Sequence, residues 1–475
     1  MRHDIPTTRG AAVRGFAMAV LVGLLAGCAM PRLPAAPASA PPLPAQWSVP
    51  LPPSAVADAA EPAGDGWWRR FGSAELDALV LRVQSGSLDL AAAAARLRQV
   101  QARARQAEAG RWPVLEAQAQ VRRQGAFGGQ AAAADPRHAL SLDAAWEWDL
   151  WGRLGAERDG AQAAVQASAL DAQALRLTLT AAAAEAWLEA VGLAERIRIG
   201  EASLAAAERI AALTEVRRRA GTATALEASR QRGLVQAQRA QVQALRQRVG
   251  EVRATLTILT AQPDPSWTPR SRLAQLAPPV VATGLPAGLL ARRPDIARAA
   301  ALLAAADAQR LAAEAARWPR LTLTASLGAE SASSRTLLRD PAYALAVGLV
   351  APLLDGGRLA AERDEAVAVR EERLVAYRQS VVQAFAEVEA ALQSQAALHA
   401  RREAQAAALA EARQAQRLAE ARWRAGADDA LALLDAQRTL FSAEDEAAVL
   451  HQAMLQMQVR LYRVLGGGWS VDALW

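Results

Sequence analysis

Residues 111–121, RWPVLEAQAQV, are matched 206 positions later by residues 317–327, RWPRLTLTASL. Short motifs that recur in the same order, separated by nearly the same number of residues, indicate an internal duplication. Two further pairs of landmarks keep the order at an offset of 205 residues: Gly152-Arg153 with Gly357-Arg358, and Arg219-Ala220-Gly221 with Arg424-Ala425-Gly426. Each copy contains an alanine-rich helix, two short alternating segments and a very long helix. This order is more typical of a conduit wall than of a catalytic pocket.

The duplication divides most of the chain into two repeats, which we place at residues 67–270 and 271–475. The first repeat holds alternating segments at about 114–123 and 139–150, and the second at about 320–330 and 342–352. In each segment apolar residues alternate with polar or small residues, as side chains do on the two faces of a β-strand. Each segment is about as long as the roughly 9–11 residues that a barrel strand needs to cross a membrane.

The N-terminus predicts export and a lipid anchor. Arg2, Arg9 and Arg14 precede an apolar run, Gly15–Leu25, which is too short for a retained membrane helix. The only cysteine of the chain, Cys28, follows the small residues that a signal peptidase prefers. We therefore interpret residues 1–27 as a lipoprotein signal peptide and Cys28 as the acylated first residue of the mature protein. The alternative is a chance thiol near an ordinary signal sequence.

Residues 28–66 contain many prolines and alanines and little periodicity. This composition is typical of an extended tether that carries the lipid anchor. The same segment could equally wrap over the folded body, and the sequence leaves both alternatives open.

Alternation alone does not distinguish a soluble antiparallel sheet from a transmembrane barrel. The export signal places the chain at a membrane, and the loops between the segments are polar and small. Aromatic residues at the segment ends suit an interfacial girdle, although Leu353 and Leu354 stand where Trp151 would repeat. The candidate interfacial residues are Trp112, Trp148, Trp151 and Trp318. Together these features favour the barrel.

Four strands cannot close a barrel, and open edges in lipid leave backbone groups unpaired at several kcal/mol each. The barrel interpretation therefore requires several copies of the chain. Three copies supply twelve strands, enough to enclose a lumen.

Two proline-free stretches, 153–219 and 358–423, predict helices of roughly 100 Å each, because an α-helix rises 1.5 Å per residue. Returning helices are expected over 224–260 and 429–465. Gly221 and Gly426 would form the two hairpin turns, where glycine permits a positive φ. The alternative is an antiparallel coiled coil in a scaffolding protein.

Composition argues against other classes of protein. The net charge is +6, and every basic residue other than histidine is arginine, spread along the predicted helices rather than gathered into the patch of a nucleic-acid binder. The four histidines are scattered, and no nucleophile elbow, phosphate loop or paired metal-ligand spacing is present. We expect no catalytic residues, no metal and no nucleic acid.

Several motifs carry a resemblance to one family. They are Gly66-Trp67-Trp68 with Phe71, Trp146-Glu147-Trp148-Asp149-Leu150-Trp151-Gly152-Arg153, Arg292-Arg293-Pro294-Asp295-Ile296, Asp355-Gly356-Gly357-Arg358, Leu434-Asp435-Ala436-Gln437-Arg438 and Leu465-Gly466-Gly467-Gly468-Trp469. In this order the chain resembles the TolC-like outer membrane efflux factors, specifically the lipoprotein branch that works with RND-type pumps. The resemblance covers the chain from Cys28 to its end.

The resemblance implies a homotrimer with a twelve-stranded outer membrane β-barrel, four strands per chain, continued by a long periplasmic α-helical barrel. Its implied partners are a periplasmic adaptor, an inner-membrane RND-type pump and outer membrane lipid. It implies passive export of small molecules with no cofactor apart from the diacylglycerol and N-acyl lipid on Cys28. The alternatives are a protein-secretion factor and a non-channel adaptor or structural lipoprotein.

The resemblance also implies a gate at the periplasmic tip, near the second hairpin turn. Asp435 matches the aspartate of the Leu-Asp-Ala-Gln motif, and Asp428 stands where some relatives place a constricting acid. Ala432 replaces a further acid of some relatives, and Trp423 replaces a frequent tyrosine. The alternative for Asp435 is a solvated residue paired with Arg438 three positions on.

Overall fold

The computed structural model describes residues 40–49, 66–123, 136–281, 283–284, 286–427 and 430–467. These residues divide into two compact units. The sheet unit contains Gln101–Ala164 and Leu302–Arg373. The helical unit contains the described residues within Ser39–Val100, Val165–Ala301 and Leu374–Trp475.

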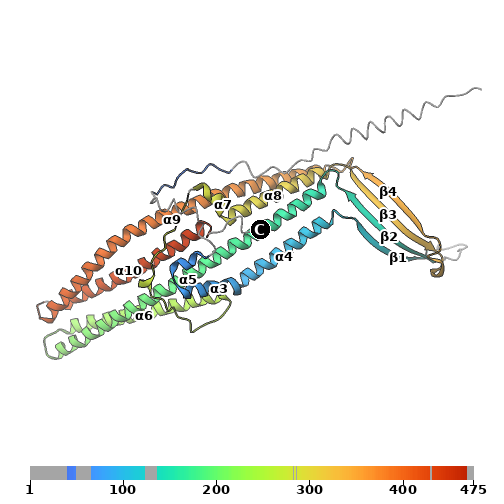
Figure 1. The fold of residues 1–475 in the computed structure, drawn as a ribbon. Helices are drawn as coiled ribbons and strands as arrows, with labels where there is room; N and C mark the ends of the chain where they lie inside the picture. The colour runs from blue at the N-terminus through green and yellow to red at the C-terminus, as the bar shows by residue number, and fades with distance from the viewer. Residues whose placement is uncertain are drawn as a thin grey trace, which may run out of the picture. The chain divides into compact units, whose positions relative to one another are not determined.

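The sheet unit contains a single four-stranded sheet in the order β1-β2-β3-β4, with every neighbouring pair antiparallel (Figure 1). The strands are β1 (Val114–Arg122), β2 (Arg137–Trp148), β3 (Arg320–Ser331) and β4 (Ala342–Val350). They lie where the alternation predicts them, with ends shifted by at most two residues. β2 stops before Leu150 because the backbone N–H of Leu150 donates to the Trp148 carbonyl (2.7 Å) in a tight turn. β4 stops before Pro352, which has no N–H to donate.

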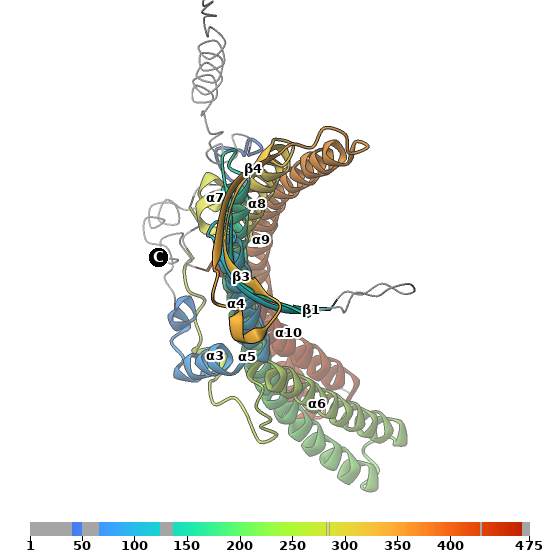
Figure 2. The same ribbon diagram turned by 90° about the vertical axis from the view of Figure 1, so that its right-hand side faces the viewer.

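The register brings the four apolar faces onto one side of the sheet. Leu142 lies opposite Ala117 of β1 and Leu327 of β3, and Leu327 lies opposite Tyr343 of β4. The polar positions line the other side, where Asp143 lies between Glu116 and Ser326. The sheet is curved rather than flat (Figure 2). The four alternating segments are therefore strands of one sheet, with their apolar positions on one side and their polar positions on the other.

The two copies repeat the same element order. In the first copy α4 (Leu88–Ala109) leads into β1, and β2 leads into α5 (Arg153–Arg219) and α6 (Ala225–Thr260). In the second copy α8 (Pro294–Ala315) leads into β3, and β4 leads into α9 (Arg358–Arg424) and α10 (Ala430–Val464). The long helices begin and end within one residue of the predicted positions. The remaining α-helices of the described residues are α3 (Ala74–Gly86) and α7 (Leu289–Arg292).

Aromatic residues near the start of the first repeat form part of the core of the helical unit. Trp67, in the short 3-10 helix η2 (Trp67–Phe71), stacks on Tyr462 of α10 with ring centroids 5.0 Å apart. Trp187 of α5 is fully buried. Alanine dominates the rest of the α5 interior, where small side chains let helices approach closely. The motif Gly66-Trp67-Trp68 therefore has a packing role.

Part of the predicted tether packs on the folded chain. Trp47 is buried, stacks on Phe385 of α9 with centroids 5.4 Å apart, and donates its indole N–H to the Gly284 carbonyl (2.8 Å). For these residues the wrapping alternative is therefore the one observed. Cys28 and the predicted signal peptide, residues 1–27, lie outside the described residues.

Among the described residues, α5 alone is long and apolar enough to cross a membrane by length and composition. In the window that meets this test, 67% of the residues are buried within the protein. Such burial is typical of a core helix. Within the described residues the strands therefore remain the elements whose pattern suits a membrane.

Candidate functional site

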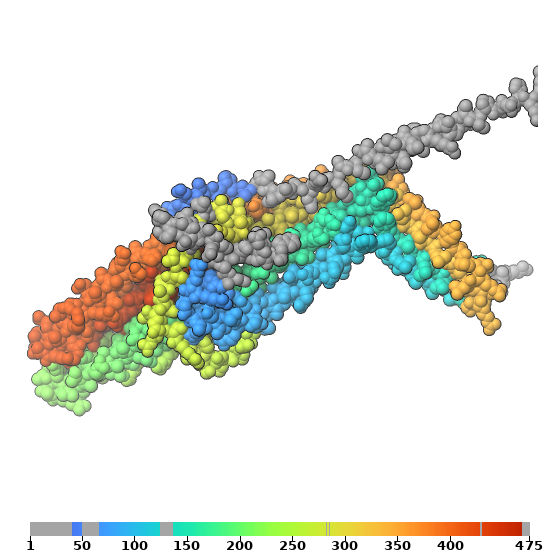
Figure 3. Space-filling model, in the orientation of Figure 1, coloured from blue at the N-terminus to red at the C-terminus, as the bar shows by residue number. Residues whose placement is uncertain are grey.

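The apolar face of the sheet is exposed to an extent unusual for a soluble protein. Tyr343 and Leu345 of β4 are 79% and 75% exposed, and residues on all four strands contribute to the same face. Figure 3 shows the β4 side chains in orange, uncovered by other coloured elements in that view. Contiguous apolar surface of this kind marks a contact with lipid or with another chain.

The opposite face is polar and carries its own hydrogen bonds. The Asp143 carboxylate accepts from the hydroxyls of Ser141 (2.5 Å) and Ser326 (2.6 Å). Glu147 of β2 pairs with Arg153 at 2.8 Å, where α5 begins. A sheet with one apolar and one charged face suits a wall between hydrocarbon and a wet lumen.

The four candidate interfacial tryptophans gather at the end of the sheet where α5 and α9 begin. Trp112, Trp148 and Trp318 are each at least 51% exposed. Trp151 stacks on Trp318 (5.3 Å between centroids) and donates its N–H to the Pro319 carbonyl (2.7 Å). Exposed indoles at one level suit a membrane interface, and that role stays a prediction. Trp146, which the prediction omitted, joins them by donating its N–H to the Arg111 carbonyl (2.9 Å).

Two aspartates cap the long helices where the chain leaves the sheet. Asp149 accepts from the backbone N–H groups of Leu154 (3.0 Å) and Gly155 (2.7 Å) at the start of α5. Asp355 accepts from Leu359 (2.9 Å) and from Gly357 at the start of α9. The hydrogen bond from the Leu359 N–H is the main cause that lowers the pKa of Asp355. Both aspartates belong to motifs of the family resemblance, and the preference for acids at helix N-termini is the signal that could have predicted their capping role.

The two hairpin turns are built alike. Gly221 (φ 76°) follows α5 and Gly426 (φ 73°) follows α9, so both adopt the left-handed region that favours glycine. After the first glycine, the Thr222 N–H donates to the Arg217 carbonyl (2.9 Å), and after the second the Ala427 N–H donates to the Arg422 carbonyl (2.9 Å). This pattern ends both helices as a left-handed C-terminal cap does. The duplication thus extends to individual hydrogen bonds.

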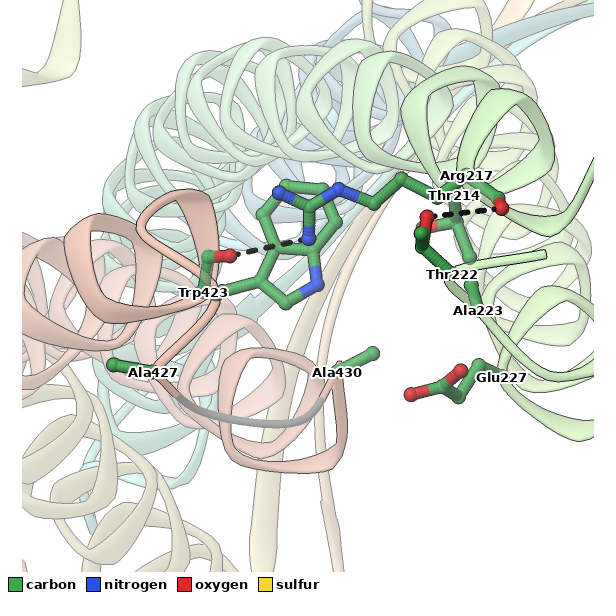
Figure 4. A pocket seen from close by; sticks show the side chains of 9 residues that line it. Thr214, Arg217, Thr222, Ala223, Glu227, Trp423, Ala427 and Ala430 are labelled. Atoms are coloured by element: carbon green, nitrogen blue, oxygen red, sulfur yellow. Dashed lines mark hydrogen bonds between the residues drawn. The ribbon is translucent and has the colours of Figure 1, made fainter. Parts of the chain in front are cut away.

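A cation–π contact joins the two hairpins beside these turns. The Arg217 guanidinium lies 4.2 Å from the centre of the buried Trp423 ring (Figure 4). Its Nη1 and Nη2 donate to the carbonyls of Trp423 (3.1 Å) and Arg424 (3.3 Å), which complements the negative C-terminal end of α9. A cavity of about 390 Å³ adjoins the contact. It is lined by Thr214, Arg217, Thr222, Ala223, Glu227, Trp423, Gly426, Ala427 and Ala430.

The predicted acidic gate is described only in part. Asp435 lies on an exposed face of α10, is not among the residues that line the cavity, and forms no ion pair with Arg438. The local pair that offered an alternative for Asp435 is therefore not formed in the described part of the chain. Asp428 lies outside the described residues. No group of three or more His, Cys, Asp or Glu among the described residues is placed to hold a metal.

Arg293, from the Arg-Arg-Pro-Asp-Ile motif, is buried in the helical unit. It binds Asp295 through two nitrogens (2.7 and 3.0 Å), Glu387 of α9 at 2.9 Å and the Val464 carbonyl of α10 at 2.9 Å. Burial works to lower the pKa of Arg293, but the two carboxylates outweigh it and the pKa is raised. The motif therefore joins the start of α8 to α9 and to the end of α10.

Known proteins share this architecture. The family model for outer membrane efflux proteins matches residues 79–262 and 285–467, one match within each repeat. The chain is 41% identical to the pyoverdine export outer membrane protein OpmQ of Pseudomonas putida, covering 86% of this chain and 89% of that protein. It is 35% identical to the outer membrane protein OprJ of Pseudomonas aeruginosa, covering 68% and 69%.

Solved structures agree with these relatives. A membrane protein from Pseudomonas aeruginosa superposes with a TM-score of 0.83 at 30% identity, covering 93% of this chain and 98% of that one. The outer-membrane channel OprN superposes with a TM-score of 0.82 at 28% identity, covering 91% and 99%. Location in the outer membrane and a part in efflux follow from these likenesses. The chain belongs to the outer membrane efflux protein family.

Proposed function

We propose that three copies of the chain form a passive outer membrane channel for small molecules. The molecules would be delivered by a periplasmic adaptor and an inner-membrane RND-type pump, and the pump would supply the energy. The observation that carries this proposal is the sheet with an exposed apolar face, a polar face and two unpaired edges, β1 and β4.

The strand directions permit closure. Because all neighbouring strands are antiparallel, β1 and β4 run in opposite directions, and β4 of one copy can continue the ladder with β1 of the next. Closure would satisfy backbone groups that cost several kcal/mol each when unpaired in lipid. Three copies would give twelve strands, with the apolar face toward lipid and the polar face toward the lumen.

Small-molecule passage is supported by the relatives. Besides the pyoverdine export protein, they include a toluene efflux pump outer membrane protein and an antibiotic efflux pump outer membrane protein, both of Pseudomonas putida. The compounds in these names differ widely in their chemistry. This favours a channel that does not select its substrate and leaves that selection to the pump. We extend the proposal to a diacylglycerol and N-acyl anchor on Cys28, which would tie the chain to the outer membrane beside the barrel.

Closure can be tested by disulfide trapping, because Cys28 is the only native cysteine. A cysteine at Ala117 of β1 is combined with a second cysteine on the same face of β4, at Tyr343, Leu345 or Val347, and outer membranes are oxidised. We expect at least one pair to give covalent species of two and three chains and none larger, because the edges meet only between copies.

The matched control combines the Ala117 cysteine with one at Ala325 of the central strand β3, where no cross-link between copies is expected. Cross-linking that stops at two chains, continues beyond three, or is equal in the control would contradict the trimeric barrel. A monomer without cross-links would favour the adaptor or structural lipoprotein.

We also propose that Asp435, and Asp428 with it, rings the closed tip of the channel. Three carboxylates around one axis would concentrate negative potential and attract cations. Asp435→Ala is therefore expected to lower the cation selectivity of single channels reconstituted in planar bilayers, and Asp435→Asn to act alike. Unchanged ion selectivity in both variants would refute the acidic ring.

A further inference from the structure

The charges on the polar face of the sheet are sorted by level. At the end that carries the β1–β2 and β3–β4 loops, Arg122 of β1 lies directly opposite Arg137 of β2. Six residues along β1, Glu116 lies directly opposite Asp143. At the end where the helices begin, Glu147 is paired with Arg153. Arg320 of β3 is exposed on the same face at this end. The face thus has a basic level at the loop end and an acidic level between its two ends.

The basic level keeps a net positive charge. Arg137 is paired at 3.2 Å with Glu330 of β3, and both side chains are more than half exposed. Arg122 is exposed and forms no ion pair within the described residues. Like charges directly opposite each other destabilise a sheet, so packing of the strands gives no reason for this pair of arginines.

The acidic level keeps a net negative charge. The Ser141 and Ser326 hydroxyls fix the orientation of the Asp143 carboxylate, and no arginine is paired with Asp143 or Glu116 in the described residues. At about 3.4 Å per residue, six residues of β1 separate the acidic level from the basic level by about 20 Å along the strand, or about 15 Å along the axis of a barrel whose strands tilt by about 40°. This separation exceeds the ~10 Å screening length at 0.1 M salt, so the two levels act on a passing ion one after the other.

We infer that the lumen carries a basic outer level set by Arg122 and an acidic inner level set by Glu116 and Asp143. This arrangement makes permeation depend on the sign of the solute's charge. The basic level lies on the loop side, where cargo would leave the channel, and it favours anionic cargo at that step. The inference rests on the proposed function, because it requires the polar face to line the lumen.

The size of the effect follows from Coulomb's law. A unit charge about 10 Å away in water, screened at 0.1 M salt and repeated in three copies, changes the local concentration of a monovalent ion by roughly twofold. At 1 M salt the screening length falls to about 3 Å, and the effect disappears.

The test measures the chloride-to-potassium permeability ratio of the full-length protein in planar bilayers under a KCl gradient around 0.1 M. Arg122→Gln is expected to lower this ratio roughly twofold relative to the wild type, and Glu116→Gln to raise it by a similar factor. Both differences should vanish around 1 M KCl. The matched control is Arg123→Gln, which makes the same charge change one residue beyond β1, where alternation leads to the lipid side.

A conducting channel whose permeability ratio is the same in the wild type, Arg122→Gln and Glu116→Gln would overturn the inference and leave the channel function intact. An effect of Arg123→Gln on the permeability ratio equal to that of Arg122→Gln would also overturn the inference. An arginine on the lipid side of the sheet would then matter as much as one in the lumen. A wild-type protein that never conducts would refute the proposed function itself, and the inference with it.

Discussion

Arg293→Ala is expected to lower the free energy of unfolding by about 2–3 kcal/mol, less than the about 3–5 kcal/mol of a fully buried ion pair, because the Asp295 and Glu387 side chains are 42% and 34% exposed. The guanidinium is buried and holds Asp295, Glu387 and the Val464 carbonyl together. The alanine variant leaves the two carboxylates close together without their shared cation. It also removes the hydrogen bond to the last turn of α10.

The measurement is the midpoint of denaturation of the detergent-extracted protein, compared with a matched arginine variant five residues further along the chain. Arg298 of α8 pairs with Asp171 at 3.0 Å, but both side chains are about half exposed. Arg298→Ala should therefore cost no more than about 1 kcal/mol. Equal losses in the two variants would show that burial does not distinguish the two ion pairs.

Local patterns made much of the fold predictable. Each strand has one apolar and one polar face, so its side chains alternate along the sequence. An alternation as short as that of Leu115, Ala117 and Ala119 is therefore enough to predict a strand. The long helices are recognisable because proline is absent over their whole lengths. Their turns are recognisable because Gly221 and Gly426 must adopt a positive φ. In each case the residues that determine the strand, helix or turn lie within that element or next to it in the sequence.

Features that depend on distant partners were not predictable. Arg217 lies 206 residues from Trp423, so only the folded chain shows that the cation covers the indole ring. Trp47 stacks on Phe385 although the composition of residues 28–66 also suits an extended tether. The burial of the Arg293 side chain likewise requires Glu387 and the Val464 carbonyl at the end of α10 as partners. None of these contacts produces a periodic pattern of residues that could be recognised in the sequence.

Leu345→Arg is expected to abolish most of the assembled channel, whereas Ala346→Arg should leave it largely intact. Leu345 lies near the middle of β4 on the apolar face, opposite Ala325, and is 75% exposed in the single chain. An arginine at the centre of the lipid-facing side of a barrel costs about 2–4 kcal/mol. A trimer would bear that cost three times. Ala346 points to the polar face opposite Thr324, where an arginine would meet water.

The measurement is the amount of heat-modifiable trimer recovered from the outer membrane, with total chain as the reference. The two variants add the same side chain at adjacent positions of one strand, so helix packing, export and strand propensity are matched. A sheet surrounded by water would tolerate both arginines equally, because both positions are exposed in the single chain. A larger loss for Ala346→Arg would reverse the assignment of the lipid and lumen faces. It would also remove the basis for two charged levels inside the barrel.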